Sequence, residues 1–277
     1  MNKRLTRIVP VLGTAVLLAN SLYAQETTTT TTTTLTTTTT PPPPPAPAPS
    51  PISGTFSLDV NTHFISYGAD VWATGTEWND PLFNPSIELN IAATDHLKFI
   101  IGTWWDVNDN AETSIGDKKI QEVDVWIGAA YSFEKVTLKL LYQEWMYASQ
   151  SERIVDFVVA GNVFLNPSLT IHGRVDSGLE VDEGIVGVLG IAHNMTLGTV
   201  GLSFPLNVAF ATDEYHGGDG GYAFASIGAN ASIPLPFMPG NWSLNAGVTG
   251  YHTSDDVIPN NPDEAFVTGK LGLTLAF

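Results

Sequence analysis

Cysteine is absent from the 277 residues, which excludes disulfides and metal sites built on cysteine. Charge is also scarce, because Asp, Glu, Lys and Arg together make up 14 % of the chain, against about 25 % in an average soluble domain. Basic residues are the rarer kind, with 11 Lys and Arg against 28 Asp and Glu and a formal net charge of −17. This shortage of positive charge argues against nucleic-acid binding. No apolar run reaches the roughly 18 residues that a mature transmembrane helix needs.

Residues 1–24 have the three parts of a secretory signal peptide. MNKRLTR carries three basic residues, IVPVLGTAVLLA is apolar, and LYAQ offers a cleavage point after Ala24. The exact bond stays open, because Leu22 is larger than the residue usual at its position. A retained membrane anchor is the alternative, which the short apolar core disfavours.

Residues 25–52 are dominated by Thr and Pro, in the run TTTTTTTTLTTTTTPPPPPAPAPSP. Such a segment cannot bury a core, so we expect a disordered periplasmic linker whose proline part is stiff polyproline II. The alternatives are a tether to the cell wall or a glycosylated stalk, and the sequence does not decide the role of this segment.

From residue 54 onward, apolar and polar residues alternate. Phe56, Leu58 and Val60, for example, alternate with Ser57 and Asp59. A period of two predicts strands with one apolar and one polar face. About twelve strands follow from this pattern, near 54–67, 85–94, 96–107, 120–133, 135–148, 153–164, 167–177, 184–196, 199–212, 221–233, 241–253 and 264–277. The segments near 153–164, 184–196 and 221–233 are apolar on both faces, so their registers stay open.

The predicted connections alternate in length. Longer acidic links such as NDNAETSIGDKK and DEYHGGDG alternate with tight turns such as TD, EK and LGT. Short turns on one side and long loops on the other are typical of transmembrane barrels, and an even strand count puts both termini on the periplasmic side. The sequence therefore predicts an all-β fold over residues 53–277, an antiparallel transmembrane up-and-down barrel of about 12 strands. A soluble sandwich is disfavoured, because the water-exposed face of its strands would carry the usual share of charged residues. Here the polar face consists of Gly, Ser, Asn, Thr and Ala with scattered acids.

The chain ends in GKLGLTLAF, with Leu271, Leu273, Leu275 and Phe277 at every second position. This ending resembles the C-terminal sorting signal of bacterial outer-membrane proteins, which the barrel-assembly machinery recognises. The resemblance covers nine residues and implies a chain that is secreted through the inner membrane and inserted into the outer-membrane lipid of a Gram-negative bacterium.

A second resemblance involves NPSIELNIAATDHLKFIIGTWWDV followed by QEVDVWIGAAYSF. These segments resemble an uncharacterised bacterial family catalogued as Gcw_chp, which has a G-T-W-like segment and then an acidic strand of the E-[IV]-D-[LVW]-[YW]-x-G type. The matching residues are Gly102, Thr103, Trp104, Glu122, Val123, Asp124, Val125, Trp126 and Gly128. HFISYGADVWATG departs from the family, because it lacks an expected Arg-Gly. The resemblance implies an outer-membrane-like β protein and gives no activity.

Because successive side chains of a strand point to opposite faces, the odd or even position of a residue (its parity) predicts whether it lines the lumen. The candidates for a pore are Asp59, His63, Glu88, Lys98, Trp104, Asp106, Glu122, Asp124, Trp126, Lys139, His172 and Arg174. Acids outnumber bases, so an open pore should prefer cations or small polar solutes. Trp104 and Trp126 could form a stacking shelf for a sugar or nucleoside. The alternative is an interior filled by ion pairs, such as Asp59 or Glu122 with Lys98 or Lys139.

Catalysis and metal binding have weaker support. His63, His172, His193 and His252 show no specific spacing to a nucleophile, so no catalytic residue and no enzyme activity are expected. The loop acids Asp213, Glu214 and Asp219 with His216 could hold a metal, but they lack the spacing of a calcium loop. We expect a solvated acidic loop there, and no cofactor.

Two functions remain open at this stage. The first is a small porin-like channel for cations or small polar solutes, which the polar, glycine-rich inner face favours. The second is a closed structural or surface-interaction barrel without transport, which mixed lumen charge and the small strand number favour. The sequence alone gives neither the solute nor the oligomeric state, and it leaves open whether the lumen is plugged.

Overall fold

The computed structural model describes residues 50–72, 78, 80–109, 115, 119–178 and 182–277. The predicted signal peptide and most of the predicted linker lie outside these residues. Every regular element in the described part is a β-strand, which confirms the predicted all-β class. No helix in that part is long or apolar enough to cross a membrane.

Twelve long antiparallel strands form a closed barrel in the described part of the chain. They are β1 (Ile52–Asn61), β4 (Leu82–Ala92), β5 (Leu97–Val107), β6 (Ile120–Ser132), β7 (Val136–Met146), β8 (Ser151–Gly161), β9 (Ser168–Ser177), β10 (Gly184–Leu197), β11 (Val200–Ala211), β12 (Gly221–Pro234), β13 (Asn241–Thr253) and β14 (Ala265–Ala276). Each strand pairs with its neighbours along the chain, and β1 closes the ring by pairing with both β14 and β4. The predicted up-and-down barrel is therefore confirmed.

Side chains alternate between an outer and an inner face along the strands. On β7, Leu140 and Tyr142 are exposed on the outer face, whereas Leu141 and Gln143 are buried on the inner face. Exposed apolar side chains of the same kind recur around the barrel, among them Ile101, Ile127, Leu189, Leu206, Ile227 and Val267. The outer face is therefore apolar, and the inner face mixes small, polar and charged residues.

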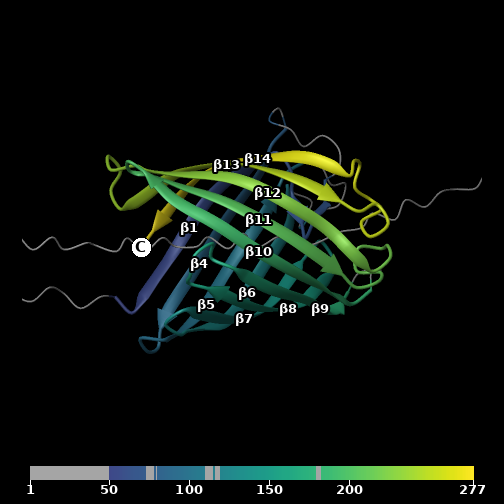
Figure 1. The fold of residues 1–277 in the computed structure, drawn as a ribbon, viewed down its shortest axis with the longest axis horizontal. Helices are drawn as coiled ribbons and strands as arrows, with labels where there is room; N and C mark the ends of the chain where they lie inside the picture. The colour runs from purple at the N-terminus through teal and green to yellow at the C-terminus, as the bar shows by residue number, and fades with distance from the viewer. Residues whose placement is uncertain (1–49, 73–77, 79, 110–114, 116–118, 179–181) are drawn as a thin grey trace, which may run out of the picture. The chain divides into compact units, whose positions relative to one another are not determined.

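The two ends of the barrel differ in their connections (Figure 1). One end carries tight turns, such as those from β4 to β5 and from β10 to β11, together with the start of β1 and the C-terminus. We call it the short-turn end, and the opposite end, with connections such as 62–81 and 254–264, the long-loop end. Gly54 N–H donates to the carbonyl oxygen of Phe277 at 2.7 Å, and Phe277 N–H donates to that of Gly54 at 3.0 Å. The last residue is therefore paired into the wall.

The first strand is shorter than predicted. The expected strand 54–67 ends as β1 at Asn61, and residues 62–72 leave the wall. This stretch, which we call the plug segment, contains a hairpin of β2 (Ile65–Ser66) and β3 (Ala69–Asp70). Residues 64–70 are all buried. The prediction was wrong here because a period of two does not distinguish a wall strand from a short hairpin that is covered on both faces.

Tyr67 and Gly68 form the two-residue loop of this hairpin. Their φ angles are 47° for Tyr67 and 95° for Gly68, and two positive values are what a type I′ turn requires. A tyrosine in this region costs on the order of 1 kcal/mol, so contacts elsewhere must hold it there. A Cβ atom on Gly68 would lie 2.5 Å from the ring of Phe224, so a side chain does not fit at this position.

An apolar cluster fills the long-loop half of the barrel interior. Tyr67 and Ala69 of the plug segment pack there against wall and loop side chains. The wall contributes Trp145, Ile154, Val186, Ala209, Ala211, Ala223 and Phe224, and the long loops contribute Tyr215, Val257 and Ile258. This cluster joins β7, β8, β10, β11 and β12 to the plug segment.

Candidate functional site: the lumen

The inner face differs between the two halves of the barrel. In the long-loop half, the inner side chains of Asp106, Glu122 and Asp124 are buried. In the short-turn half, the inner residues Ser57 and Thr274 are only half-buried. The barrel interior is therefore closely packed at the long-loop end, whereas inner side chains such as Ser57 and Thr274 near the short-turn end are partly exposed.

Arg174 of β9 and Glu152 of β8 form an ion pair inside the filled half, and both side chains are 0 % exposed. Arg174 Nη1 also donates to the main-chain oxygens of Asp182 and Tyr215, each at 3.0 Å. The Tyr147 hydroxyl donates to Glu152 Oε2 at 2.8 Å. A buried pair needs such additional bonds, because removing each ion from water costs on the order of several kcal/mol.

His172 of β9 belongs to the same group of side chains. Its Nδ1 lies 2.6 Å from Asp156 Oδ1, and Gln143 Nε2 donates to the other Asp156 oxygen at 2.6 Å. Trp145 Nε1 in turn donates to Gln143 Oε1 at 3.3 Å. We call the following residues the inner polar cluster: Gln143, Glu152, Asp156, His172 and Arg174.

The plug segment packs directly on this cluster. The rings of Tyr67 and His172 lie 3.9 Å apart between centroids at an interplanar angle of 30°. From the β13–β14 loop, Asn261 Nδ2 donates to the Gly68 carbonyl at 2.9 Å, and Asn261 Oδ1 accepts from Asp70 N–H at 2.8 Å. The hairpin is therefore held by the wall and by a long loop together.

Further contacts hold both ends of the plug segment. Thr62 N–H donates to the Gly269 carbonyl at 2.9 Å, and Thr62 Oγ1 accepts from Gly269 N–H at 2.8 Å. At the other end, Trp72 Nε1 donates to Asp106 Oδ2 at 2.7 Å. Asn84 Nδ2 donates to Asp106 Oδ1 at 2.9 Å. Asp106 therefore links the plug segment to β4 and β5.

Tyr215 and His216, in the β11–β12 connection, are buried beside the inner polar cluster. The Tyr215 ring centroid lies 4.1 Å from the guanidinium carbon of Arg174. Burial raises the pKa of Tyr215 well above its ordinary value. Burial, and then the positive charge of Arg174, lowers the pKa of His216 from 6.5 to about 3. Protonating His216 would place a second positive charge near Arg174, so it stays neutral at neutral pH.

Trp104 and Trp126 both contact other side chains of the barrel interior. Trp126 Nε1 donates to Glu88 Oε2 at 3.2 Å, across Gly102, which has no side chain to block the approach. Trp126 is only 7 % exposed. The ring of Trp104 lies 5.1 Å from that of Phe64 in the plug segment. Trp126 therefore has little free surface for a sugar or nucleoside, whereas Trp104 is half-buried and contacts Phe64.

Among the described lysines of the inner face, Lys270 forms an ion pair and Lys98 and Lys139 do not. Lys270 Nζ lies 2.7 Å from Asp59 Oδ2, across the pairing of β1 with β14. Lys98 on β5 and Lys139 on β7 make no ion pair within the described residues. The alternative of an ion-paired interior is therefore right in kind, because Asp59 pairs with Lys270 and Glu152 pairs with Arg174. Its suggested partners Lys98 and Lys139 are wrong, because the register places small or apolar residues beside both lysines.

The remaining predicted residues lie at separate places. His63 lies beyond the end of β1, where its Nδ1 is 2.9 Å from Asp70 Oδ2 in the plug segment. The residues of the proposed sorting signal alternate along the outer face of β14 and end at the short-turn end: Leu271, Leu273, Leu275 and Phe277. Phe277 is 49 % exposed.

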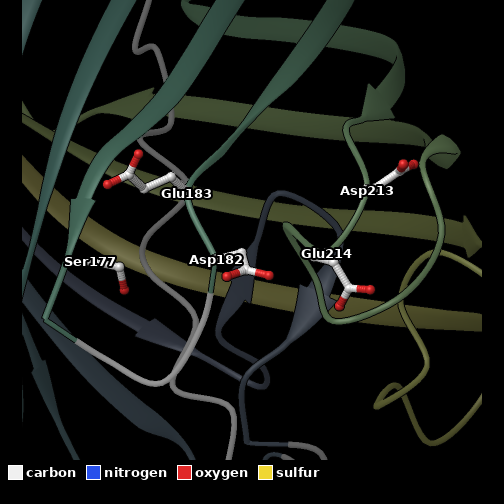
Figure 2. A pocket seen from close by; sticks show the side chains of 5 residues that line it. All are labelled: Ser177, Asp182, Glu183, Asp213 and Glu214. Atoms are coloured by element: carbon white, nitrogen blue, oxygen red, sulfur yellow. The ribbon is translucent and has the colours of Figure 1, made fainter.

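An acidic pocket lies near the end of β9, where the β11–β12 connection meets the start of β10 (Figure 2). Its lining residues are Ser177, Asp182, Glu183, Asp213 and Glu214. Asp213 Oδ1 accepts a hydrogen bond from Gly220 N–H at 2.7 Å, so this carboxylate stabilises the β11–β12 connection in which it lies. No group of three or more His, Asp or Glu side chains in the described ranges is arranged to hold a metal ion, and this includes the loop acids considered above.

Sequence patterns do not single out three residues of this site: Tyr67, Trp145 and Glu152. Glu152 shares its parity with Asp156 on the same strand, so the alternation carried a signal for it. Gly68, directly after Tyr67, is a turn signal between apolar residues. Trp145 gives the same sequence signal as any apolar strand residue. Its place in the apolar cluster depends on the plug segment, which the sequence did not predict.

No family model matches the chain, and no curated relative matches it. Among solved structures, a KdgM porin in complex with disordered oligogalacturonate is 9 % identical with a TM-score of 0.43, over 81 % of this chain and 99 % of that one. A porin refined at 1.8 Å is 12 % identical with a TM-score of 0.35, over 77 % and 67 %. A triple mutant of the Rhodopseudomonas blastica porin is 11 % identical with a TM-score of 0.29, over 82 % and 99 %. Similarities this weak transfer no function, and the resemblance to Gcw_chp stays a prediction.

Proposed function

We propose that the chain is an outer-membrane β-barrel of a Gram-negative bacterium with a porin-like lumen. A closed ring of strands has no unpaired edge, as a hydrocarbon environment requires. Its outer face exposes apolar side chains such as Ile127 and Leu140, which suit lipid better than water. In this arrangement the long loops face the outside and the short turns face the periplasm.

The C-terminal strand supports the same location. Leu271, Leu273 and Leu275 alternate along the outer face, and Phe277 is paired to Gly54 at the short-turn end. We propose that outer-membrane lipid surrounds these side chains and that the barrel-assembly machinery recognises them before insertion. A signal peptide at residues 1–24 would deliver the chain to the periplasm.

The plug segment packed inside a closed ring of strands is the observation that carries the proposed function. Small polar solutes can enter the short-turn half, and the plug segment stops them at the long-loop half. We therefore propose a porin-like channel that is closed in this structure and conducts when residues 62–72 leave the lumen. Because the closing contacts include a buried apolar cluster, openings should be rare in the native protein.

The proposed open pore favours cations or neutral polar solutes. Release of the plug segment would uncover Asp106, which accepts a hydrogen bond from Trp72, in the half of the lumen where Glu122 and Asp124 are also buried. Fixed negative charge in a channel of low dielectric constant concentrates cations. Anions would meet this barrier at the long-loop half.

Single-channel current in a planar bilayer tests the proposal. The native mature chain is compared with a variant in which residues 63–71 are replaced by a Gly/Ser linker of equal length. We expect rare openings from the native chain and steady, cation-preferring steps from the variant. Silence from both proteins, with both shown to be folded by faster migration before boiling in detergent gels, would contradict the channel.

A closed structural or surface-interaction barrel is the second candidate. The apolar cluster favours it, because it ties the plug segment to five wall strands and could make closure permanent. Under this candidate the native chain never opens at any voltage or pH, although the linker variant conducts. Native openings therefore separate the two functions.

A further inference from the structure

Two lysines on the inner face lack the partners that other basic residues have. The described basic residues that pair with a carboxylate are Lys119, Arg153, Arg174 and Lys270. Lys98 and Lys139 make no ion pair and no side-chain hydrogen bond within the described residues, and both are half-buried. An ammonium group on the inner wall without an ion pair can bind a ligand of opposite charge.

The strand register brings these lysines to the two sides of one small residue. Lys98 on β5 is opposite Ala130 on β6, and Ala130 is opposite Lys139 on β7. Neighbouring strands lie about 4.8 Å apart, so the two lysine Cα positions are separated by roughly 10 Å. Two extended lysine side chains can therefore reach one small anion from both sides.

Two hydroxyl groups lie beside the lysines. Ser132 on β6 and Thr137 on β7 are directly opposite each other, with 3.2 Å between their oxygens. They lie on the inner face two residues from Ala130 and Lys139, toward the short-turn end. On the two flanking strands, β4 and β8, the residues directly opposite this group are all apolar: Ala92, Val158 and Ala160. No carboxylate is therefore directly opposite either lysine in the strand register. The two lysines and two hydroxyl groups together make the group rich in hydrogen-bond donors.

The carboxylates that act on Lys139 through space are hydrogen-bonded elsewhere. Glu88 and Asp156 attract it, and Lys98 repels it. Glu88 accepts from Trp126 Nε1 at 3.2 Å, and Asp156 is held within the inner polar cluster. Neither acid forms an ion pair with the lysine, so a bound anion would relieve the repulsion between the two ammonium groups.

We propose that Lys98, Ser132, Thr137 and Lys139 form a binding site for a small oxyanion of carboxylate or phosphate chemistry. Ammonium groups only donate, and hydroxyl groups can donate to an anion, so all four side chains suit such a ligand. The site lies toward the short-turn end, and all four of its side chains are half-buried. The proposed anion enters from the short-turn end while the plug segment stays in place, so binding does not depend on conduction.

Competitive acylation of lysines tests the site on the folded, full mature chain in detergent. A small amine-reactive reagent is applied with chloride, inorganic phosphate or succinate at equal ionic strength, and labelling is read by mass spectrometry. At a ligand concentration of about twice Kd, labelling of Lys98 and Lys139 should fall roughly threefold by mass action. Lys135, which is exposed in the β6–β7 turn, should not change.

Two variants make the test specific. Lys98→Gln should abolish the protection of Lys139, whereas Lys135→Gln, with the same change of charge, should preserve it. Protection by phosphate, by succinate or by both supports the site and identifies the oxyanion that it prefers. Equal changes at Lys135, no protection by either anion, or protection of Lys139 that survives Lys98→Gln would overturn the proposal. A failure of channel activity would leave these readouts unaffected.

Discussion

At the scale of single residues, the filled half of the lumen depends on charges that are buried and partnered. Arg174 has a carboxylate, two carbonyl oxygens and an aromatic ring around it. Asp106 accepts hydrogen bonds from side chains of the plug segment and of β4. Such groups contribute little net stability as pairs, but the loss of one partner leaves a buried charge without compensation.

The first prediction compares two arginines on adjacent strands. Arg174→Met should lower the free energy of unfolding by about 3–5 kcal/mol, because it leaves Glu152 buried and unpaired. Arg153→Met removes an exposed pair whose side chains are 50 % and 51 % exposed, and should cost about 0–1 kcal/mol. Denaturant unfolding in lipid vesicles, followed by tryptophan fluorescence, measures both. Equal losses would contradict the role given to the buried pair.

The second prediction concerns acid and His216. The pKa of His216 is lowered to about 3 by burial and by Arg174, with His172 a further positive neighbour. Between this value and the ordinary pKa of 6.5, His216 is protonated in the unfolded loop and neutral in the folded loop. The free energy that keeps the loop closed is therefore at its full value above pH 6.5 and falls as the pH drops from 6.5 toward 3. Between pH 7.5 and 5.5 the local opening constant should rise roughly tenfold.

Hydrogen-exchange protection factors for residues 212–220 measure this opening, since they are corrected for the intrinsic effect of pH. His216→Leu fills the buried position with an apolar side chain that does not titrate, so it should remove the pH dependence between pH 7.5 and 5.5. If the variant kept the same dependence, another group would be responsible for the acid response.

At the scale of elements, the plug segment determines whether the lumen is open. It is short, it contains a strained two-residue loop, and it touches β5, β9, β12, β14 and the β13–β14 loop. The same contacts that close the barrel also hold Tyr67 in a backbone conformation that costs energy. A change at this loop should therefore release the segment without disturbing the wall.

The third prediction uses two glycines with the same φ of 95°, Gly68 and Gly240. Gly68→Ala adds a Cβ atom 2.5 Å from the Phe224 ring inside the barrel, so it should displace the hairpin and raise the frequency of channel openings. Gly240→Ala carries the same backbone cost in the short β12–β13 turn, where the Cβ atom would meet the flexible end of Leu275 at 3.0 Å. Planar-bilayer recordings of both variants compare them. Similar opening frequencies would argue that the hairpin does not gate the pore.

The wall strands could be predicted from the sequence, and the plug segment could not. A strand such as β7 alternates clearly, because lipid selects its outer residues and the lumen its inner ones. The strands whose registers stayed open, β8, β10 and β12, contribute Ile154, Val186 and Phe224 to the inner apolar cluster. These three apolar residues face inward and belong to the same cluster as Tyr67 and Ala69 of the plug segment, so the ambiguity in the sequence marked the region that the prediction missed.

At the scale of the whole molecule, charge is divided between the two halves of the lumen. Counting all inner acids predicts a uniformly negative pore, but Asp106, Glu122 and Asp124 are buried in the filled half. The short-turn half contains Lys98 and Lys139, which make no ion pair within the described residues. Strand parity gives the face of a residue, but it gives neither its depth along the barrel nor what covers it.

The most direct test of the closed long-loop end is the sidedness of thiol labelling. The chain has no cysteine, so Ser243→Cys, on the inner face of β13 in the short-turn half, provides a single reporter. A membrane-impermeant thiol reagent is added to intact cells of a host without its own general porins, and again after the periplasm is opened. We predict labelling only from the periplasmic side in the native barrel, and labelling from both sides when residues 63–71 are replaced by a linker. Labelling of the native barrel from outside at the rate of the linker variant would contradict closure by the plug segment.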